Sequence, residues 1–228
     1  MNRATPKTQS ALLEAMQESE VTAGGETHTL EQPFIVLATQ NPLEMDGTYP
    51  LPEAQLDRFL FKIQVPFPKR EELNEVLVRT TGSKSHEVQS VLTGAEILKH
   101  RSAIRMIEAA PHVQDYAVRL LLATHPSSPM ATEQVKRWVR FGASPRGVQS
   151  ILLGAKVRAA LAGRLHLGFD DIRKTAPAAL RHRILLGFEG EAEGISVDNI
   201  VTDILESTPE LLEAGLDNSG LDNSGLDK

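Results

Sequence analysis

The apolar run at residues 34–38, Phe-Ile-Val-Leu-Ala, constrains the fold more than any other feature of the sequence. Such a run is typical of a strand buried on both faces of a parallel sheet that helices cover. It ends at Thr39, Gln40 and Asn41, and Pro42 prevents its continuation as a central strand. Because ligands of open α/β sheets bind beyond the carboxyl ends of the strands, we expect Asn41 at a binding crevice.

The first third of the chain alternates between helical and extended patterns. A second apolar run, at 60–65, predicts another buried strand and is closed by Pro66 and Pro68. Two strands are too few for a buried parallel sheet, so we expect further strands from another chain or from sequence ahead of Met1. The other predicted elements are a helix to Glu18, a β-hairpin at 21–30 turning at Gly24 and Gly25, a short helix at 52–58, and a helix at 69–79 with Leu73, Val76 and Leu77 inward.

The pattern changes at the polar hinge 82–85, Gly-Ser-Lys-Ser, which we take as a domain boundary. Residues 1–81 are then an α/β domain, and residues 82–210 are an all-α bundle. Residues 211–228 contain a five-residue Gly-Leu-Asp-Asn-Ser repeat and form an acidic tail that we expect to be disordered. Helices of the bundle are predicted to begin near Thr93, His112, Ser144, Asp170 and Ser196.

Composition excludes several classes of site. Cysteine is absent, so disulfides and thiolate chemistry are excluded, and the seven histidines show no metal-ligand spacing. The sequence has no apolar run near the ~18 residues of a membrane helix and no apolar signal region, so we expect a cytoplasmic protein. The segment 136–183 holds eleven Lys or Arg and only two Asp, which predicts either an anionic partner or solvated basic helix faces.

Several of these segments together resemble the MoxR family of AAA+ ATPases. The resemblance covers residues 2 to about 206, and its motifs are dense. It implies the C-terminal half of an AAA+ P-loop core, with a partial parallel sheet and a pre-sensor β-hairpin, followed by a helical lid domain. The matching segments are the helix at 2–16, Ala-Thr-Gln-Asn-Pro at 38–42 (sensor 1), 47–59 (arginine finger), Gly-Ala-Ser-Pro-Arg at 142–146 (sensor 2) and 180–184 (a lid motif).

The resemblance also implies a function. Members of this family are ATPases, so we expect ATP to be bound and hydrolysed, with Mg²⁺, between identical subunits of a ring, most simply a hexamer. The work done would be chaperone-like remodelling or metal-cofactor insertion. The client is unknown, and a von Willebrand A domain protein is one type of partner that the family suggests. We expect neither nucleic-acid binding nor membrane insertion. Low aromatic content, 4%, and the net charge of −6 disfavour nucleic acid, although related AAA+ clades act on DNA.

Three residues match functional positions of the family. Asn41 would position the attacking water, since an amide can both donate to phosphate and accept from water. Arg58 would be the arginine finger, and Arg146 the sensor 2 arginine at a helix N-terminus, where phosphate binds readily. The residues themselves leave plainer alternatives open. Asn41 could cap a turn, Arg58 could pair with Asp57 or Glu53, and Arg146 could be an ordinary first-turn residue.

One departure from the family is as important as the matches. The sequence has no G-x-x-x-x-G-K-[ST] phosphate loop, and no apolar strand ending in Asp-Glu precedes Asn2. We therefore expect both, and the Mg²⁺ ligands, to lie ahead of Met1, in which case this chain alone is an inactive, truncated subunit. A non-catalytic interaction module is the alternative. Arg181 and Arg183 could contact a subunit interface, but solvated side chains are the simpler expectation.

Overall fold

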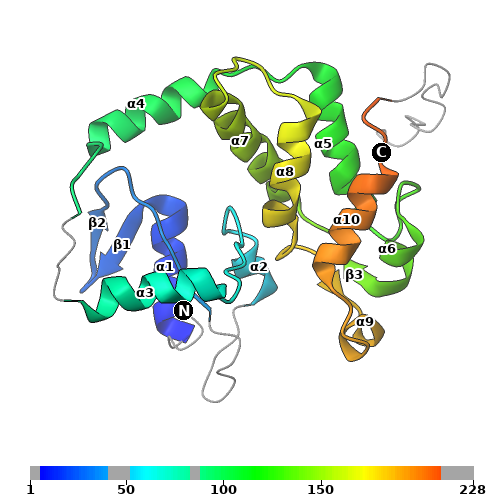
Figure 1. The fold of residues 1–228 in the computed structure, drawn as a ribbon, viewed down its shortest axis with the longest axis horizontal. Helices are drawn as coiled ribbons and strands as arrows, with labels where there is room; N and C mark the ends of the chain where they lie inside the picture. The colour runs from blue at the N-terminus through cyan, green and yellow to red at the C-terminus, as the bar shows by residue number, and fades with distance from the viewer. Residues whose placement is uncertain (1–5, 41–51, 83–87, 212–228) are drawn as a thin grey trace. The chain divides into compact units, whose positions relative to one another are not determined.

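The computed structural model describes residues 6–40, 52–82 and 88–211 and divides into two compact units, Met1–Ile107 and Glu108–Lys228 (Figure 1). The first unit contains α1 (Pro6–Glu18), β1 (Glu20–Ala23), β2 (Glu26–Thr29), α2 (Glu53–Leu56), α3 (Arg70–Thr81) and α4 (Gly94–Arg105). The second contains α5 (Pro111–Ala123), α6 (Glu133–Trp138), β3 (Val139–Phe141), α7 (Pro145–Leu161), α8 (Phe169–Leu180), β4 (Leu185–Leu186), α9 (Phe188–Ala192) and α10 (Val197–Ser207).

The division between the units falls later than the predicted domain boundary at residue 82. Helix α4 belongs with the first unit, where a Cβ placed on Gly94 would lie 3.1 Å from Pro33 Cδ. The sequence could not show this contact because the hinge at 82–85 separates α3 from α4 by composition alone. The assignment of 1–81, 82–210 and 211–228 as domains remains a prediction.

The predicted hairpin is present in the first unit. Strands β1 and β2 pair antiparallel, with Glu20 opposite Thr29. The turn uses Gly24 at φ 64° and Gly25 at φ 89°, a left-handed pair that glycine adopts without steric cost. The hairpin lies against α1, since the Thr22 hydroxyl donates to Glu14 Oε1 at 3.0 Å. Helix α1 ends at Glu18, as predicted, and its buried apolar residues are Leu13 and Ala15.

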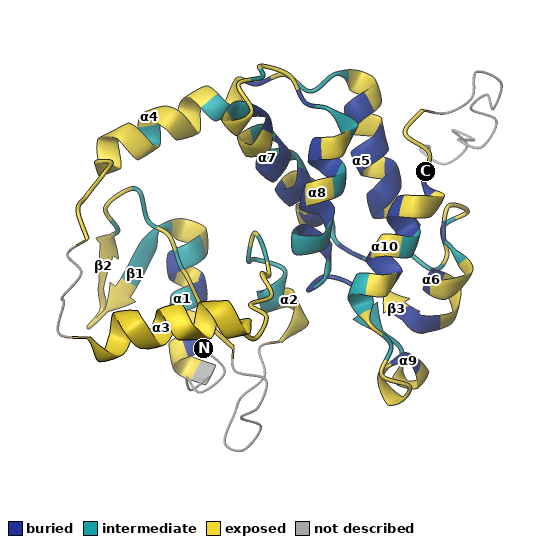
Figure 2. Ribbon diagram, in the orientation of Figure 1, coloured by how far each residue is buried: buried dark blue, intermediate teal, exposed yellow. Residues whose placement is uncertain are grey.

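The two predicted parallel strands are wrong for the described residues. Neither 34–38 nor 60–65 forms a strand, and most of their apolar side chains are exposed: Leu37 is 95% and Val65 90% accessible. A central strand requires backbone partners on both sides, and the sheets of the described residues pair β1 with β2 and β3 with β4 and include neither run. The face of α3 that was expected to point inward is also exposed (Figure 2).

The second unit has a closed hydrophobic core. Helix α7 packs on α8 and α5, and α10 packs on α8 and α5. Their inward faces bury large side chains completely, as the dark blue faces in Figure 2 show. This helical unit also includes a two-stranded antiparallel ribbon, β3–β4, which corrects the all-α prediction. The fully buried large residues are Tyr116, Leu120, Val135, Ile151, Ile172, Leu180, Ile200, Val201 and Ile204.

Local sequence signals explain where the helices of the second unit begin. Proline occupies the first position of α5 and of α7, where its missing N–H costs no hydrogen bond. The Ser144 hydroxyl caps α7, and the Thr132 hydroxyl caps α6 by accepting from Val135 N–H at 3.3 Å.

Candidate functional site

The Arg146 loop, residues 142–146, joins β3 to α7 and is fixed to the end of α5. Ala143 N–H donates to Thr124 Oγ1 at 2.9 Å, and the same hydroxyl donates to Leu121 O at 2.6 Å. The His125 ring contributes the second contact, because its Nε2 donates to Ala143 O at 3.0 Å. Both backbone polar groups of Ala143 are therefore held by side chains of consecutive residues.

Two glycines lie where this part of the chain approaches other helices closely. A Cβ on Gly142 would lie 2.7 Å from Thr124 O, from Thr124 Oγ1 and from His125 Cγ, closer than real Cβ atoms approach. A Cβ on Gly147 would lie 3.1 Å from Leu121 Cδ1 and 3.3 Å from Leu180 Cδ2. At Gly142 the loop lies close to the end of α5. At Gly147 helix α7 lies close to α5 and α8.

Arg146 occupies the first turn of α7 with its side chain exposed. Its N–H donates to Ser144 Oγ at 3.2 Å, and the Ser150 hydroxyl donates to Arg146 O at 2.8 Å. A cation at a helix N-terminus is slightly unfavourable unless an anion is bound beside it. The exposed guanidinium and the partial positive charge of the helix end together suit a phosphate group.

Arg58 lies just after α2 in the first unit, and its N–H donates to Gln55 O at 3.3 Å. Its side chain is half-buried. The Nε and Nη1 atoms are buried and have no hydrogen-bond partner among the described residues. Buried guanidinium donors without partners are costly, so this side chain has capacity for an acceptor. Asn41, the third predicted site residue, lies outside the described residues, and Arg58 and Arg146 belong to different units.

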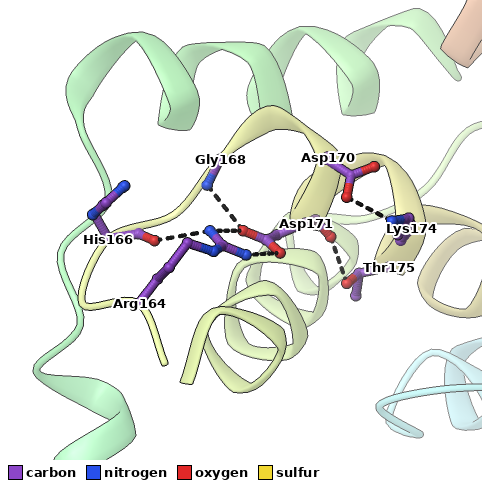
Figure 3. A network of polar contacts seen from close by, with 7 residues as sticks. All are labelled: Arg164, His166, Gly168, Asp170, Asp171, Lys174 and Thr175. Atoms are coloured by element: carbon purple, nitrogen blue, oxygen red, sulfur yellow. Dashed lines mark hydrogen bonds and ion pairs between the residues drawn. The ribbon is translucent and has the colours of Figure 1, made fainter. Parts of the chain in front are cut away.

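A separate polar network fixes the connection between α7 and α8 (Figure 3). Arg164 Nη1 and Nη2 each donate to the Asp171 carboxylate at 2.7 Å, and Gly168 N–H donates to Asp171 Oδ2 at 3.0 Å. The Asp171 side chain is 3% exposed. The hydrogen bonds from Arg164, with that from Gly168, hold the pKa of Asp171 below its usual value despite the opposing effect of burial. Asp171 therefore makes the predicted cap of α8, by accepting a hydrogen bond from Gly168 N–H. Its bidentate pair with Arg164 was not indicated by the sequence.

The basic segment 136–183 uses many of its cations internally. Arg173 Nη1 donates to Tyr116 Oη at 3.1 Å and to Leu205 O at 3.0 Å. Burial raises the pKa of Tyr116, with the positive charge of Arg173 opposing the shift. Arg181 donates to Asp198 at 2.8 Å, and the buried Arg183 donates to Ala179 O. The expectation that Arg181 and Arg183 are solvated is wrong, because a carboxylate and a backbone carbonyl compensate for their desolvation.

The described residues contain no group of three or more His, Asp or Glu side chains arranged to hold a metal ion. Across the same residues, no helix combines the length and apolar character needed to span a membrane.

Comparison with known proteins follows the same division of the chain. Residues 1–61 match the family model "ATPase family associated with various cellular activities (AAA)", and residues 132–204 match the model "AAA lid domain". The chain is 40% identical to the chaperone MoxR1 of Mycobacterium tuberculosis over 91% of its own length and 55% of that protein. It is also 40% identical to the protein YeaC of Bacillus subtilis, over 91% of this chain and 62% of that one.

A solved structure shows the same fold. A chain of Cytophaga hutchinsonii described as a candidate ATPase matches with a TM-score of 0.86 and 39% identity, over 91% of this chain and 63% of that chain. The present chain therefore spans less than two thirds of the length of each of these three relatives.

These matches first define a class, an AAA+ core segment followed by an AAA lid domain. Within that class the chain is similar to the MoxR-type AAA+ ATPases. This confirms the resemblance inferred from the sequence.

Proposed function

We propose that this chain is a subunit of a MoxR-type ring, most simply a hexamer, in which ATP is bound and hydrolysed between neighbouring subunits. The observation that carries the proposal is the Arg146 loop: a close-packed segment that presents an exposed arginine at the start of a long helix. The energy of hydrolysis would drive chaperone-like remodelling or metal-cofactor insertion, acting on a protein client such as one with a von Willebrand A domain. The general class, an AAA+ ATPase, comes from the family matches.

The three site residues take different parts in this proposal. Asn41 positions the attacking water, Arg58 stabilises the charge on the transferred phosphoryl group from a neighbouring subunit, and Arg146 contacts the phosphates. Phosphoryl transfer depends mainly on positioning and charge neutralisation, and a forked guanidinium suits both. Support for Arg58 comes from its two buried N–H groups without partners among the described residues. The described residues offer no cluster to hold Mg²⁺, so we assign no Mg²⁺ ligand to them.

The chain by itself is proposed to be inactive, because the printed sequence lacks the phosphate-loop pattern. The test is phosphate release from Mg²⁺-ATP by the purified 228-residue chain, which we expect to equal the background rate. Steady turnover that Arg58→Ala abolishes would contradict this part of the proposal and would support catalysis by this chain alone.

The role of Arg58 can be tested in a chimera that joins the phosphate-loop segment of the MoxR1 chaperone to this chain. Arg58→Ala should lower turnover by on the order of 10³-fold, the range for an arginine finger. Arg58→Lys should also be impaired, because an ammonium group lacks the fork. The matched control is Arg79→Ala, which removes an exposed arginine paired with Glu75 on α3 and should leave turnover unchanged.

Mixing variants separates action between subunits from action within one. Chimeras carrying Asn41→Ala and chimeras carrying Arg58→Ala should each be inactive. A mixture should recover activity, because some interfaces then combine an intact Asn41 with an intact Arg58 from the neighbour. A mixture as inactive as its components would contradict an arginine acting across the interface.

Nucleic-acid remodelling is less well supported by the structure. Several cations of the basic segment are committed to internal partners, including Lys174 with Asp170 and Arg164 with Asp171. Nucleic-acid binding would instead give an affinity that falls steeply with salt, in proportion to the number of phosphates contacted.

A further inference from the structure

The end of α5 holds the Arg146 loop through two residues that no family motif in the sequence points to. Thr124, the C-terminal cap residue of α5, uses one hydroxyl in two directions: it donates to Leu121 O at 2.6 Å and accepts from Ala143 N–H at 2.9 Å. His125 Nε2 donates to Ala143 O at 3.0 Å. A residue of the loop thus has both its backbone groups satisfied by side chains from the end of a helix nearly twenty residues away in sequence.

Burial makes these contacts difficult to replace. Thr124 and Ala143 are both 0% exposed. A backbone N–H or C=O that loses its partner at a buried position is destabilising, because no water molecule can replace the lost hydrogen bond. Gly142 adds a steric limit, since its Cα lies against Thr124 and His125 with no room for a Cβ.

Ala143 lies close to Arg146 in the sequence. Ala143 immediately precedes Ser144, the N-cap of α7, and Pro145 follows at the first helical position with its φ restricted by its ring. Few backbone torsions therefore separate Ala143 from Arg146. Fixing Ala143 against the end of α5 fixes where the first turn of α7 presents its guanidinium.

We propose that Thr124 and His125 are positioning residues for Arg146, which set the direction of the exposed guanidinium by holding Ala143 from both sides. The consequence for nucleotide rests on the proposed function, in which Arg146 contacts phosphate. The direct claim about the Arg146 loop does not rest on it and can be measured without nucleotide.

The test uses the full 228-residue chain and paired variants. Thr124→Val keeps the shape but removes the hydroxyl, whereas Thr124→Ser keeps the hydroxyl. Thr175→Val is the matched control, because Thr175 is also a buried helical threonine whose hydroxyl donates to a backbone carbonyl, that of Asp171 at 2.8 Å, away from the loop. His125→Leu and His125→Gln form a second pair, which decides the matter if Thr124→Val fails to fold.

The first readout is amide hydrogen exchange by NMR at residues 143–147. In Thr124→Val we expect exchange at Ala143 and Arg146 to quicken by about tenfold, the effect of losing one buried hydrogen bond. Thr124→Ser and Thr175→Val should remain near the wild-type rates at these positions. Equal exchange in Thr124→Val and Thr175→Val across the loop would overturn the proposal, because Thr124 would then act only as a structural part of α5.

The second readout is binding of inorganic triphosphate, followed by the Arg146 Nε–H resonance. Thr124→Val should weaken binding by roughly five- to tenfold, and Thr124→Ser should restore it. Unchanged affinity in Thr124→Val, with wild-type exchange rates, would contradict positioning. A wild-type chain whose Arg146 resonance does not respond to triphosphate would count against the nucleotide contact in the proposed function, while the exchange rates would still decide the role of Thr124 and His125.

Discussion

The two units differ in how they treat similar apolar sequence. In the second unit, Leu120 and Ile172 are 0% exposed within a closed helical core. In the first unit, Leu37 is 95% and Ile63 75% exposed, although they stand in the apolar runs at 34–38 and 60–65. Apolar side chains of these two runs are thus largely exposed in the first unit, whereas the helices of the second unit bury theirs.

The difference shows that an apolar run predicts burial but not the partner that achieves it. Helices satisfy their own backbone hydrogen bonds, so the helices of the second unit need only side-chain contacts. A buried strand also requires neighbouring strands for its backbone groups. The runs at 34–38 and 60–65 belong to neither sheet of the described residues.

The largest expected effect comes from the core of the second unit. Leu120→Ala should lower the free energy of unfolding by about 2–5 kcal/mol, because it leaves a cavity among buried side chains. The single tryptophan, Trp138, is 8% exposed in this unit and reports its unfolding in urea by fluorescence. Leu122→Ala, on the same helix but 43% exposed, is the matched control and should cost much less.

A leucine-to-alanine substitution in the first unit tests whether the two units differ in this way. Leu37→Ala should change stability by less than about 0.5 kcal/mol, as at most exposed positions, measured by circular dichroism. A loss as large as that of Leu120→Ala would show that the run at 34–38 is buried in solution.

The next effect is electrostatic and depends on pH. Asp171→Asn should destabilise the second unit by about 1.5–3 kcal/mol at neutral pH, because it weakens a hydrogen-bonded carboxylate. Since the folded pKa of Asp171 lies below its usual value, its contribution is complete above the ordinary carboxyl pKa of about 4 and is lost as the pH falls through the folded value.

The wild-type urea midpoint should therefore decline on acidification more than that of Asp171→Asn. Asp170→Asn is the control, because Asp170 pairs with Lys174 while 70% exposed and should have little effect. Parallel acid profiles for wild type and Asp171→Asn would contradict the importance of the Arg164 pair.

A similar or slightly smaller effect is expected at the Arg146 loop. Gly142→Ala should cost about 1–3 kcal/mol, because the new methyl group would overlap Thr124 and His125. Gly187→Ala is the control, since its Cβ would meet Trp138 O at an ordinary 3.6 Å. Equal urea midpoints for these two variants would show that the loop can move away from α5 without cost.

A smaller, local effect is expected at the start of α4. Thr93 and Glu96 form a capping box: Glu96 N–H donates to Thr93 Oγ1 at 3.3 Å, and Thr93 N–H donates to Glu96 Oε2 at 2.7 Å. Thr93→Ala should loosen the helix by about 1 kcal/mol, seen as faster amide exchange in its first turn. Ser102→Ala, on the same helix, should not change that turn. An unchanged exchange rate in Thr93→Ala would contradict a stabilising cap.

Local chemistry made part of this fold predictable. The hairpin followed from Gly24 and Gly25, and α7 from Ser144 and Pro145, because turns and caps depend on neighbouring residues. The ribbon β3–β4 and the pairing of Arg164 with Asp171 depend on contacts between separated segments, and no short motif encodes them. At the candidate site, Arg146 was placed from its motif, but Thr124 and His125 were missed, because a threonine and a histidine after an apolar helix give no signal of what they hold.

Arg119 ties α5 to the segment that follows α10. This buried side chain pairs with Asp115 and donates to the backbone oxygens of Pro209 and Glu210, at 2.6 and 3.0 Å. Every residue has a main-chain oxygen, so substitutions at Pro209 and Glu210 keep the two acceptors. Substitution of Arg119 removes the donors. Residues 209 and 210 can therefore be exchanged to build labelled or fused forms of the protein, provided that Arg119 is kept.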